Sequence, residues 1–320
     1  MKKSLIVWLI IAVALIIAGI AVTIFGFASV GFDLSAISTD SEKTDMISVD
    51  DDFSSIVIDG STADLKILPS TDGKCTIDLV EREKIYHLAS VENGVLKISE
   101  KDDRKWYEYI GISWGNMSVT LYLPKAQYDK LSIDMSTADI EIADTLSFNS
   151  ARIKTSTGDI KLEASVCRSL SIEASTANIF ASGVNGADVK IKTSTGGIEL
   201  SDSACKNLEI ESSTGKVKLS DVSGTGGFNI ITTTGKITLS DTVTTSDLSI
   251  IAETGKVNLE RCDAANINII TDTGDVEGSL LSSKIFFYET DTGNVDLPRT
   301  TEGGRCNIKT DTGDIKITIQ

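Results

Sequence analysis

Three Asp-Thr-Gly triplets are the residues whose types and spacing most directly suggest chemistry. They begin at Asp272, Asp291 and Asp311. Two isoleucines stand shortly before the first triplet, separated from it by one threonine. Aspartic proteases carry such a triplet after hydrophobic residues, and their two aspartates must face each other and share a proton. Here single changes connect the triplet with Ser-Thr-Gly and Glu-Thr-Gly at equivalent places in the chain. We therefore interpret it as a recurrent structural corner and not as a protease site.

The same acids suggest cation binding. The residue before the corner threonine is serine in early copies and an acid in later ones, and stacked copies would place these acids about 5 Å apart. Like charges this close destabilise the fold unless they are neutralised, and Ca²⁺ prefers carboxylate and carbonyl oxygens. The sequence predicts a low-affinity Ca²⁺ stripe, with a solvated acidic edge as the alternative. Its residues would be Asp272, Asp275, Asp291, Asp311 and Asp314.

A candidate partner surface lies three residues before the corner threonine, where the pattern points outward. Ile231, Ile251 and Ile270 occupy this place in successive copies, with Phe287 nearby, whereas most other copies carry a charged residue there. A stack of three outward isoleucines predicts a contact surface. The alternative is chance exposure of residues that favour strands.

Two tryptophans provide a second candidate partner surface. Trp106 and Trp114 follow a charged run in a section between Cys75 and Pro124 that lacks the periodic pattern of the rest. This section also holds His87, the single histidine, for which the sequence indicates no catalytic partner. We expect the section to cap the open first coil of a repeat structure, and exposed aromatics could also make it a binding tip.

These residues belong to a repeat of 19 or 20 residues, whose clearest copy is Ser156-Thr157-Gly158-Asp159-Ile160. A separate early copy contains Thr62. A fixed period of this size is typical of stacked repeat architectures. The contiguous corner threonines are Thr137, Thr157, Thr176, Thr195, Thr214, Thr234, Thr254, Thr273, Thr292 and Thr312.

The apolar residues within one copy predict its structure. They alternate six and four residues before the threonine and three and five residues after it, as in Leu170, Ile172, Ile179 and Ala181. Alternation by two indicates two short strands, joined by a corner at which glycine could adopt a positive φ. A third apolar column follows, including Val184 and, further on, Leu281. The predicted fold is all-β, a parallel β-solenoid of about ten or eleven coils of 19–20 residues.

The N-terminus predicts a membrane anchor. Two lysines precede a long uncharged run from Leu5 to Val30, which exceeds the about 20 residues that span a bilayer. A cleaved signal peptide is the alternative, but its hydrophobic region is usually shorter. The lysines place the N-terminus in the cytoplasm and the rest outside the cell. We expect an anchor over residues 1–32, a stalk over 33–52, a first coil with its cap over 53–130 and regular coils over 131–320.

Composition narrows the function classes. The formal net charge of −16 argues against binding to nucleic acid or to anionic lipid surfaces. The five cysteines are interpreted as small buried hydrophobic residues, without a disulfide framework, and no cofactor other than Ca²⁺ is expected.

The repeated Ser-Thr-Gly-Asp corner, the anchor led by Lys2 and Lys3 and the acidic stalk together resemble a bacterial family of candidate adhesin domains. The resemblance covers Phe53 to Gln320. It implies a membrane-tethered β-solenoid linked to envelope stress in Gram-positive bacteria, with no established catalytic residues to transfer. One departure is that alanine replaces the corner glycine at three positions, where the corner must be strained or turn differently: Ala63, Ala138 and Ala177.

Two functions remain as hypotheses. The first is a membrane-anchored extracellular solenoid, not an enzyme, that acts as a binding or structural module of the cell envelope toward an envelope protein or a glycan. The second is a carbohydrate-active enzyme on a β-helix scaffold, which would need clustered acids that break the repeat on one lateral face.

Overall fold

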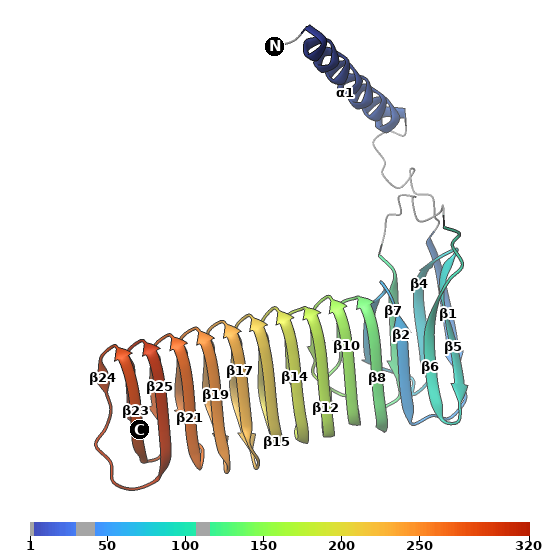
Figure 1. The fold of residues 1–320 in the computed structure, drawn as a ribbon. Helices are drawn as coiled ribbons and strands as arrows, with labels where there is room; N and C mark the ends of the chain where they lie inside the picture. The colour runs from blue at the N-terminus through green and yellow to red at the C-terminus, as the bar shows by residue number, and fades with distance from the viewer. Residues whose placement is uncertain (1–2, 30–41, 107–115) are drawn as a thin grey trace.

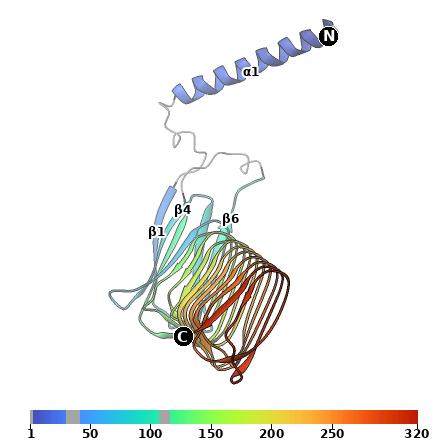
Figure 2. The ribbon, with the colours of Figure 1, turned by 90° about the vertical axis from the view of Figure 1, so that its left-hand side faces the viewer.

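The computed structural model describes residues 3–29, 42–106 and 116–320 (Figure 1). Apart from one helix, α1 (Lys3–Ser29), its regular elements are strands, which join in a single sheet system that winds into a solenoid. Seen toward the end that carries β23 and β24, the coils superpose as closed loops (Figure 2). The predicted parallel β-solenoid of about ten coils, with one N-terminal apolar helix, is confirmed.

The first side of each coil runs up to the corner threonine, and its strands pair in parallel and in register with those of the adjacent coils. Alternation of buried and outward side chains along these strands explains why they form. In spatial order the first side contains β6 (Val95–Asp102), β2 (Ser55–Gly60), β8 (Gln127–Thr137), β10 (Ser147–Thr157), β12 (Ser165–Thr176), β14 (Asn185–Thr195), β15 (Ile198–Thr214), β17 (Phe228–Thr234), β19 (Asp247–Thr254), β21 (Asn266–Thr273), β25 (Gly304–Thr312) and β23 (Lys284–Thr292).

The second side follows the corner. The long strand β15 begins on the second side of one coil and continues into the first side of the next. In spatial order the other strands of this side are β7 (Ser118–Leu123), β3 (Asp64–Pro69), β9 (Ile140–Ile142), β11 (Ile160–Leu162), β13 (Ile179–Ser182), β16 (Val217–Gly224), β18 (Ile237–Thr244), β20 (Val257–Cys262), β22 (Val276–Leu280), β26 (Ile315–Ile319) and β24 (Val295–Asp296).

The core is a continuous set of isoleucine, leucine and valine columns inside the coils. The two predicted strand columns are buried as expected, for example at Ile172, Ile191 and Ile210. The third column differs at Leu281, which was expected inside and is exposed. A register irregularity between β20 and β22 pairs Cys262 with Leu280, so Leu280 takes the inward place and Leu281 faces outward.

Close approach between coils explains the corner glycines. A Cβ added at Gly196 would lie 1.9 Å from the carbonyl oxygen of Ala177 in the adjacent coil, and its φ is +126°. The amide of Gly196 donates to the carbonyl of Thr214 on the other side, at 3.0 Å. Three coils carry alanine in place of the corner glycine, at Ala63, Ala138 and Ala177. All three alanines are buried and none has a positive φ, so these corners turn differently and are not strained glycine-type corners.

The N-terminal end departs from the expected linear order. β6 and β7 form the outermost coil-like layer, and β2 and β3 lie between this layer and β8 and β9. The strands β4 (Cys75–Arg82) and β5 (Ile85–Glu92) add to this layer in antiparallel fashion. A tight hairpin turn joins β5 and β6, with φ of +52° at Asn93 and +74° at Gly94.

The segment expected to be a stalk contains a strand that sequence reasoning did not identify. β1 (Glu42–Val49) pairs antiparallel with β4 over its whole length. Its side chains are mostly exposed, so its sequence carries little hydrophobic alternation. Backbone pairing with an available sheet edge, and not apolar burial, therefore specifies this strand.

The C-terminal end contains a swapped pair of coils. β21 pairs with β25 and not with β23, which follows it in the chain, and β25 pairs with β23 on its other side. The chain therefore builds the terminal coil of β23 and β24 first and then returns to insert β25 and β26 between that coil and the coil of β21 and β22 (Figure 1).

Local chemistry supports this swap. A Cβ at Gly303 would lie 1.8 Å from the carbonyl oxygen of Ser283, and one at Gly304 would lie 1.7 Å from that of Ala265, so the returning chain needs both glycines. Lys284 is nearly buried, and its Nζ lies 2.6 Å from an Asp263 carboxylate oxygen. Because Lys284 belongs to the terminal coil and Asp263 precedes β21, this ion pair bridges the inserted coil.

The cysteines are free thiols, and all but one are buried. Burial raises the pKa of Cys75 to about 11 and that of Cys205 to about 12, so both stay protonated and unreactive. Cys167, expected to be buried, is exposed. Register irregularities where β14 meets β15 place Ala187 opposite Cys205, so equal repeat positions do not give equal environments here.

Two adjacent glycines allow a matched test of the corner. The Gly196→Ala variant should lower the free energy of unfolding by more than about 2 kcal/mol, because it combines a positive φ with a backbone clash. The Gly197→Ala variant is the control, since its Cβ would meet its nearest neighbours at 3.6 Å and 3.7 Å. Denaturant unfolding measures both; equal losses would show that close approach does not select the corner glycine.

Candidate functional site

The acids proposed to bind Ca²⁺ do form a column, in a different order from the chain. The swap places Asp311 between Asp272 and Asp291, as the amides of Gly274 and Gly313 show by donating to Thr312 and Thr292. All three acidic residues are exposed. In the part of the chain that the structure describes, no three His, Cys, Asp or Glu side chains gather closely enough to hold a metal ion. The Ca²⁺ stripe therefore remains a prediction.

Asp275 and Asp314 have a structural partner already. An Asp275 carboxylate oxygen accepts a hydrogen bond from the Asp314 amide at 3.0 Å, and an Asp314 oxygen accepts one from the Asn294 amide at 2.7 Å. The same bond joins early corners, where Asp139 accepts from the amide of Asp159. These side chains thus satisfy backbone amides that follow the corner, which explains why Asp or Asn recurs there.

The three outward isoleucines form a continuous strip. Ile231 pairs in register with Ile251, and Ile251 with Ile270. Each is half-buried by its neighbours. The strip ends at Glu211 on one side and Lys309 on the other, so charged residues bound it along the rod. Phe287 is two coils beyond Ile270 and in the neighbouring outward column, where it pairs with Asn307, so it is not a continuation of the strip.

A second apolar feature lies on the second side and was not predicted. Phe180 is 46% exposed in an outward column that otherwise carries charged residues, from Lys66 through Glu141 and Lys161 to Glu199. It lines a shallow hollow of about 440 Å³ with Lys161, Glu163, Glu199 and others. The replacement of a charged residue by an aromatic one in this column was the available sequence signal.

The acids of this hollow are neutralised by lysines. Glu199 lies 2.6 Å from Lys218, and Glu163 lies 2.9 Å from Lys161. Neutralised carboxylates on a regular column are typical of a surface charge ladder. The hollow therefore offers an apolar ring framed by ion pairs, which suits binding better than acid–base chemistry.

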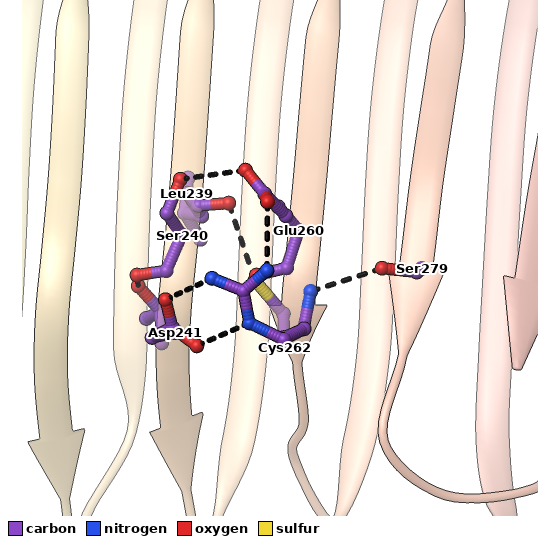
Figure 3. A network of polar contacts seen from close by, with 8 residues as sticks. Leu239, Ser240, Asp241, Glu260, Cys262 and Ser279 are labelled. Atoms are coloured by element: carbon purple, nitrogen blue, oxygen red, sulfur yellow. Dashed lines mark hydrogen bonds and ion pairs between the residues drawn. The ribbon is translucent and has the colours of Figure 1, made fainter. Parts of the chain in front are cut away.

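A further polar network surrounds Arg261 at the corner after the second side (Figure 3). Its guanidinium donates to both Asp241 oxygens across one coil, and a third nitrogen lies 2.7 Å from Glu260. The hydrogen bonds from Arg261 hold the pKa of Asp241 below its usual range. Arg261 has a left-handed backbone conformation with positive φ, as do Asp202, Asp221 and Asp241. The network stabilises a corner, because one guanidinium is shared by two carboxylates.

His87 is buried in the cap between two glutamates. Its Nδ1 lies 3.0 Å from Glu81 Oε1, and its Nε2 lies 3.9 Å from Glu100 Oε2. Glu100 also accepts the Ser61 amide at 2.9 Å, which joins the cap to the coil of β2 and β3. Sequence reasoning missed this cluster because its members come from three strands of the non-periodic section.

Of the two tryptophans proposed as a binding tip, Trp106 lies within the described residues. Trp106 is 78% exposed, as a binding tip would require. Trp114 lies outside the described residues, so the predicted aromatic tip stays a prediction.

The profile of the Toastrack DUF4097 family matches residues 53–242 and 203–320, which together include every described strand except β1. The chain therefore belongs to the Toastrack DUF4097 family. This agrees with the resemblance to candidate adhesin domains inferred from the repeated corner. No curated protein matches the chain.

Several solved structures are similar to this chain. A candidate adhesin from Parabacteroides merdae ATCC 43184 is 15% identical, with 88% of this chain and 98% of that chain covered and a TM-score of 0.40. A candidate adhesin from Parabacteroides distasonis ATCC 8503 is 13% identical, with 87% and 98% covered and a TM-score of 0.42. A candidate lipid-binding protein from the same strain is 13% identical, with 88% and 98% covered and a TM-score of 0.38. These low scores transfer no ligand to this chain.

The revised order of the acids gives a test. At low ionic strength Asp311→Ser should raise the melting temperature more than Asp291→Ser, because Asp311 has an acid on each side and Asp291 on one side only. The free energies of unfolding of the two variants should differ by about a few tenths of a kcal/mol, as for other exposed charges. Differential scanning calorimetry measures it.

A second arm of the experiment examines the Ca²⁺ stripe. Millimolar Ca²⁺ should raise the melting temperature of the unmodified chain above that in matched ionic strength, and Asp311→Ser should abolish this rise. An equal response of both proteins to Ca²⁺ would leave only the solvated acidic edge.

Proposed function

We propose that this chain is a membrane-anchored binding module of the bacterial cell envelope, with the solenoid on the outer side. The observation that carries the proposal is the apolar surface of α1. From Trp8 to Ser29 its mean hydropathy is 2.9, and none of that surface is buried against the rest of the protein. Such a surface is unfavourable in water and matches the bilayer interior, which a helix of this length can span.

The orientation follows from charge. Lys2 and Lys3 precede the apolar run, and the next charged residue is Asp33. Lysines are retained on the cytoplasmic side of a membrane, so the solenoid would face outward. A signal sequence near the N-terminus has similar properties, and the experiment below distinguishes the two.

The lateral faces of the solenoid support binding as its role. They present a regular pattern of ion-paired columns, which the isoleucine strip and Phe180 interrupt. Apolar interruptions framed by charge are typical of contact surfaces for a protein or a glycan. We also propose that the protein takes part in the response to envelope stress, which the resemblance to the family of candidate adhesin domains supports.

Topology has a direct test. Protease treatment of intact cells should release the solenoid while α1 stays with the membrane, because only the residues after the helix are outside. Mass spectrometry of the membrane-bound chain before treatment should find the N-terminal helix still attached. Protection of the solenoid would contradict the orientation, and loss of the helix would identify a signal sequence.

The isoleucine strip has a test with a matched control. Replacing Ile231, Ile251 and Ile270 by lysine should reduce sedimentation of the protein with isolated envelope material several-fold and leave the fold intact, because all three point outward. The control replaces Asn229, Ser249 and Asn268 by lysine. These residues lie in register on the same strands and receive a similar change in charge. Equal binding by both variants would leave the strip without a role in contact.

A further inference from the structure

We propose that the terminal coil is a self-association site, at which the edge of β23 pairs antiparallel with β23 of a second copy of this chain. The two ends of the solenoid differ. At one end the cap adds antiparallel strands beyond the last coil. At the other end, within the described residues, β23 pairs on one side only, with β25, and β24 pairs only with β26. The end that β23 forms faces the viewer in Figure 2.

The terminal coil leaves core positions uncovered. Tyr288 is in register with Ile308, which is fully buried, yet Tyr288 is 58% exposed because no described strand lies beyond it. Phe286 occupies the equivalent of the buried Cys306 and is itself only partly buried. Apolar residues also take the outward places of this strand, at Ile285 and Phe287. A long strand that lacks a neighbouring strand along one edge, with apolar residues on both faces, favours pairing with another strand.

The occupant is indicated by the self-complementarity of β23. A two-fold axis at Phe287 would place Phe286 opposite Tyr288 of the second copy on the inward face. By the same symmetry, Tyr288 would lie opposite Phe286 of the second copy. Two aromatic cross-strand pairs would thus close both exposed cores. On the outward face the two Phe287 side chains would meet, each with the guanidinium of an Arg305 4.3 Å from its ring centroid.

Charge predicts the salt dependence of this contact. Each chain carries a formal net charge of −16, and Glu289 and Asp291 lie on the pairing strand. Two such chains repel each other at long range, whereas the contact itself is apolar. Association should therefore strengthen as ionic strength rises, opposite to a contact made by complementary charges.

Two outward substitutions test the surface in the full-length chain, held in detergent micelles. Sedimentation velocity at micromolar concentration should show a dimer, and the double variant Ile285→Lys and Phe287→Lys should weaken it by at least about tenfold. The control is Phe180→Lys, since Phe180 is exposed to 46% and Phe287 to 45%, and Phe180 lies on the lateral face. It should leave the dimer unchanged.

Cross-linking tests the register. In a Cys167→Ser background, which removes the exposed thiol, the Phe287→Cys variant should form a disulfide-linked dimer on mild oxidation. Its two copies would place their Cα atoms about 5 Å apart, within disulfide reach. Glu289→Cys is the control, since its two copies would lie about 14 Å apart along the strands.

Three outcomes would overturn the proposal. They are a chain that sediments as a monomer at every concentration, a dimer that the lysine variants do not weaken, and equal cross-linking at positions 287 and 289. A dimer held by α1 would give the second of these. The result does not depend on the membrane orientation proposed above.

Discussion

Parallel pairing between adjacent coils is the interaction on which the rest of this structure depends. Each strand inside the rod satisfies its backbone amides and carbonyls with the coils on either side, and the in-register ladder then places its side chains in columns. The corners must obey the same spacing, which brings Gly196 so close to the carbonyl of Ala177 that a side chain at this backbone conformation would clash. The corner motif is thus a consequence of stacking.

Stacking also determines which residues can act on a partner. Inward columns are occupied by the core, and several outward columns contain ion pairs between adjacent coils, such as Lys192 with Glu211 and Lys190 with Glu209. Contact surfaces can therefore arise where a column changes character. The isoleucine strip and Phe180 are such changes on the lateral faces, and β23 is one at the end of the rod.

A solenoid has two ends, and this chain treats them differently. The cap extends the sheets with β1, β4 and β5, and it is joined to the first coil through Glu100 and Ser61. The other end reverses the order of its last two coils and leaves β23 at the edge. The Lys284–Asp263 pair stabilises that order, because separating it would leave the buried ammonium of Lys284 without its carboxylate.

The sequence by itself determined the fold class, the corner and the core columns, since a 19- or 20-residue period with alternating apolar residues is compatible with few other structures. It also identified the isoleucine strip as continuous, because neighbouring coils there follow chain order. It did not identify β1, whose strand is specified by an available edge and not by its own pattern.

Only the tertiary structure decided the order of the last coils and the surroundings of His87. A periodic sequence pattern cannot distinguish the order in which coils of nearly equal length stack. The position of Asp311 between Asp272 and Asp291 therefore depends on other contacts, namely those of Gly303, Gly304 and Lys284. The His87 cluster joins residues from different strands of a non-periodic section, where no local rule specifies pairing. The physical reason is the same in both cases. Side-chain periodicity encodes which face a residue occupies, whereas long-range contacts decide which coil or strand lies next to it.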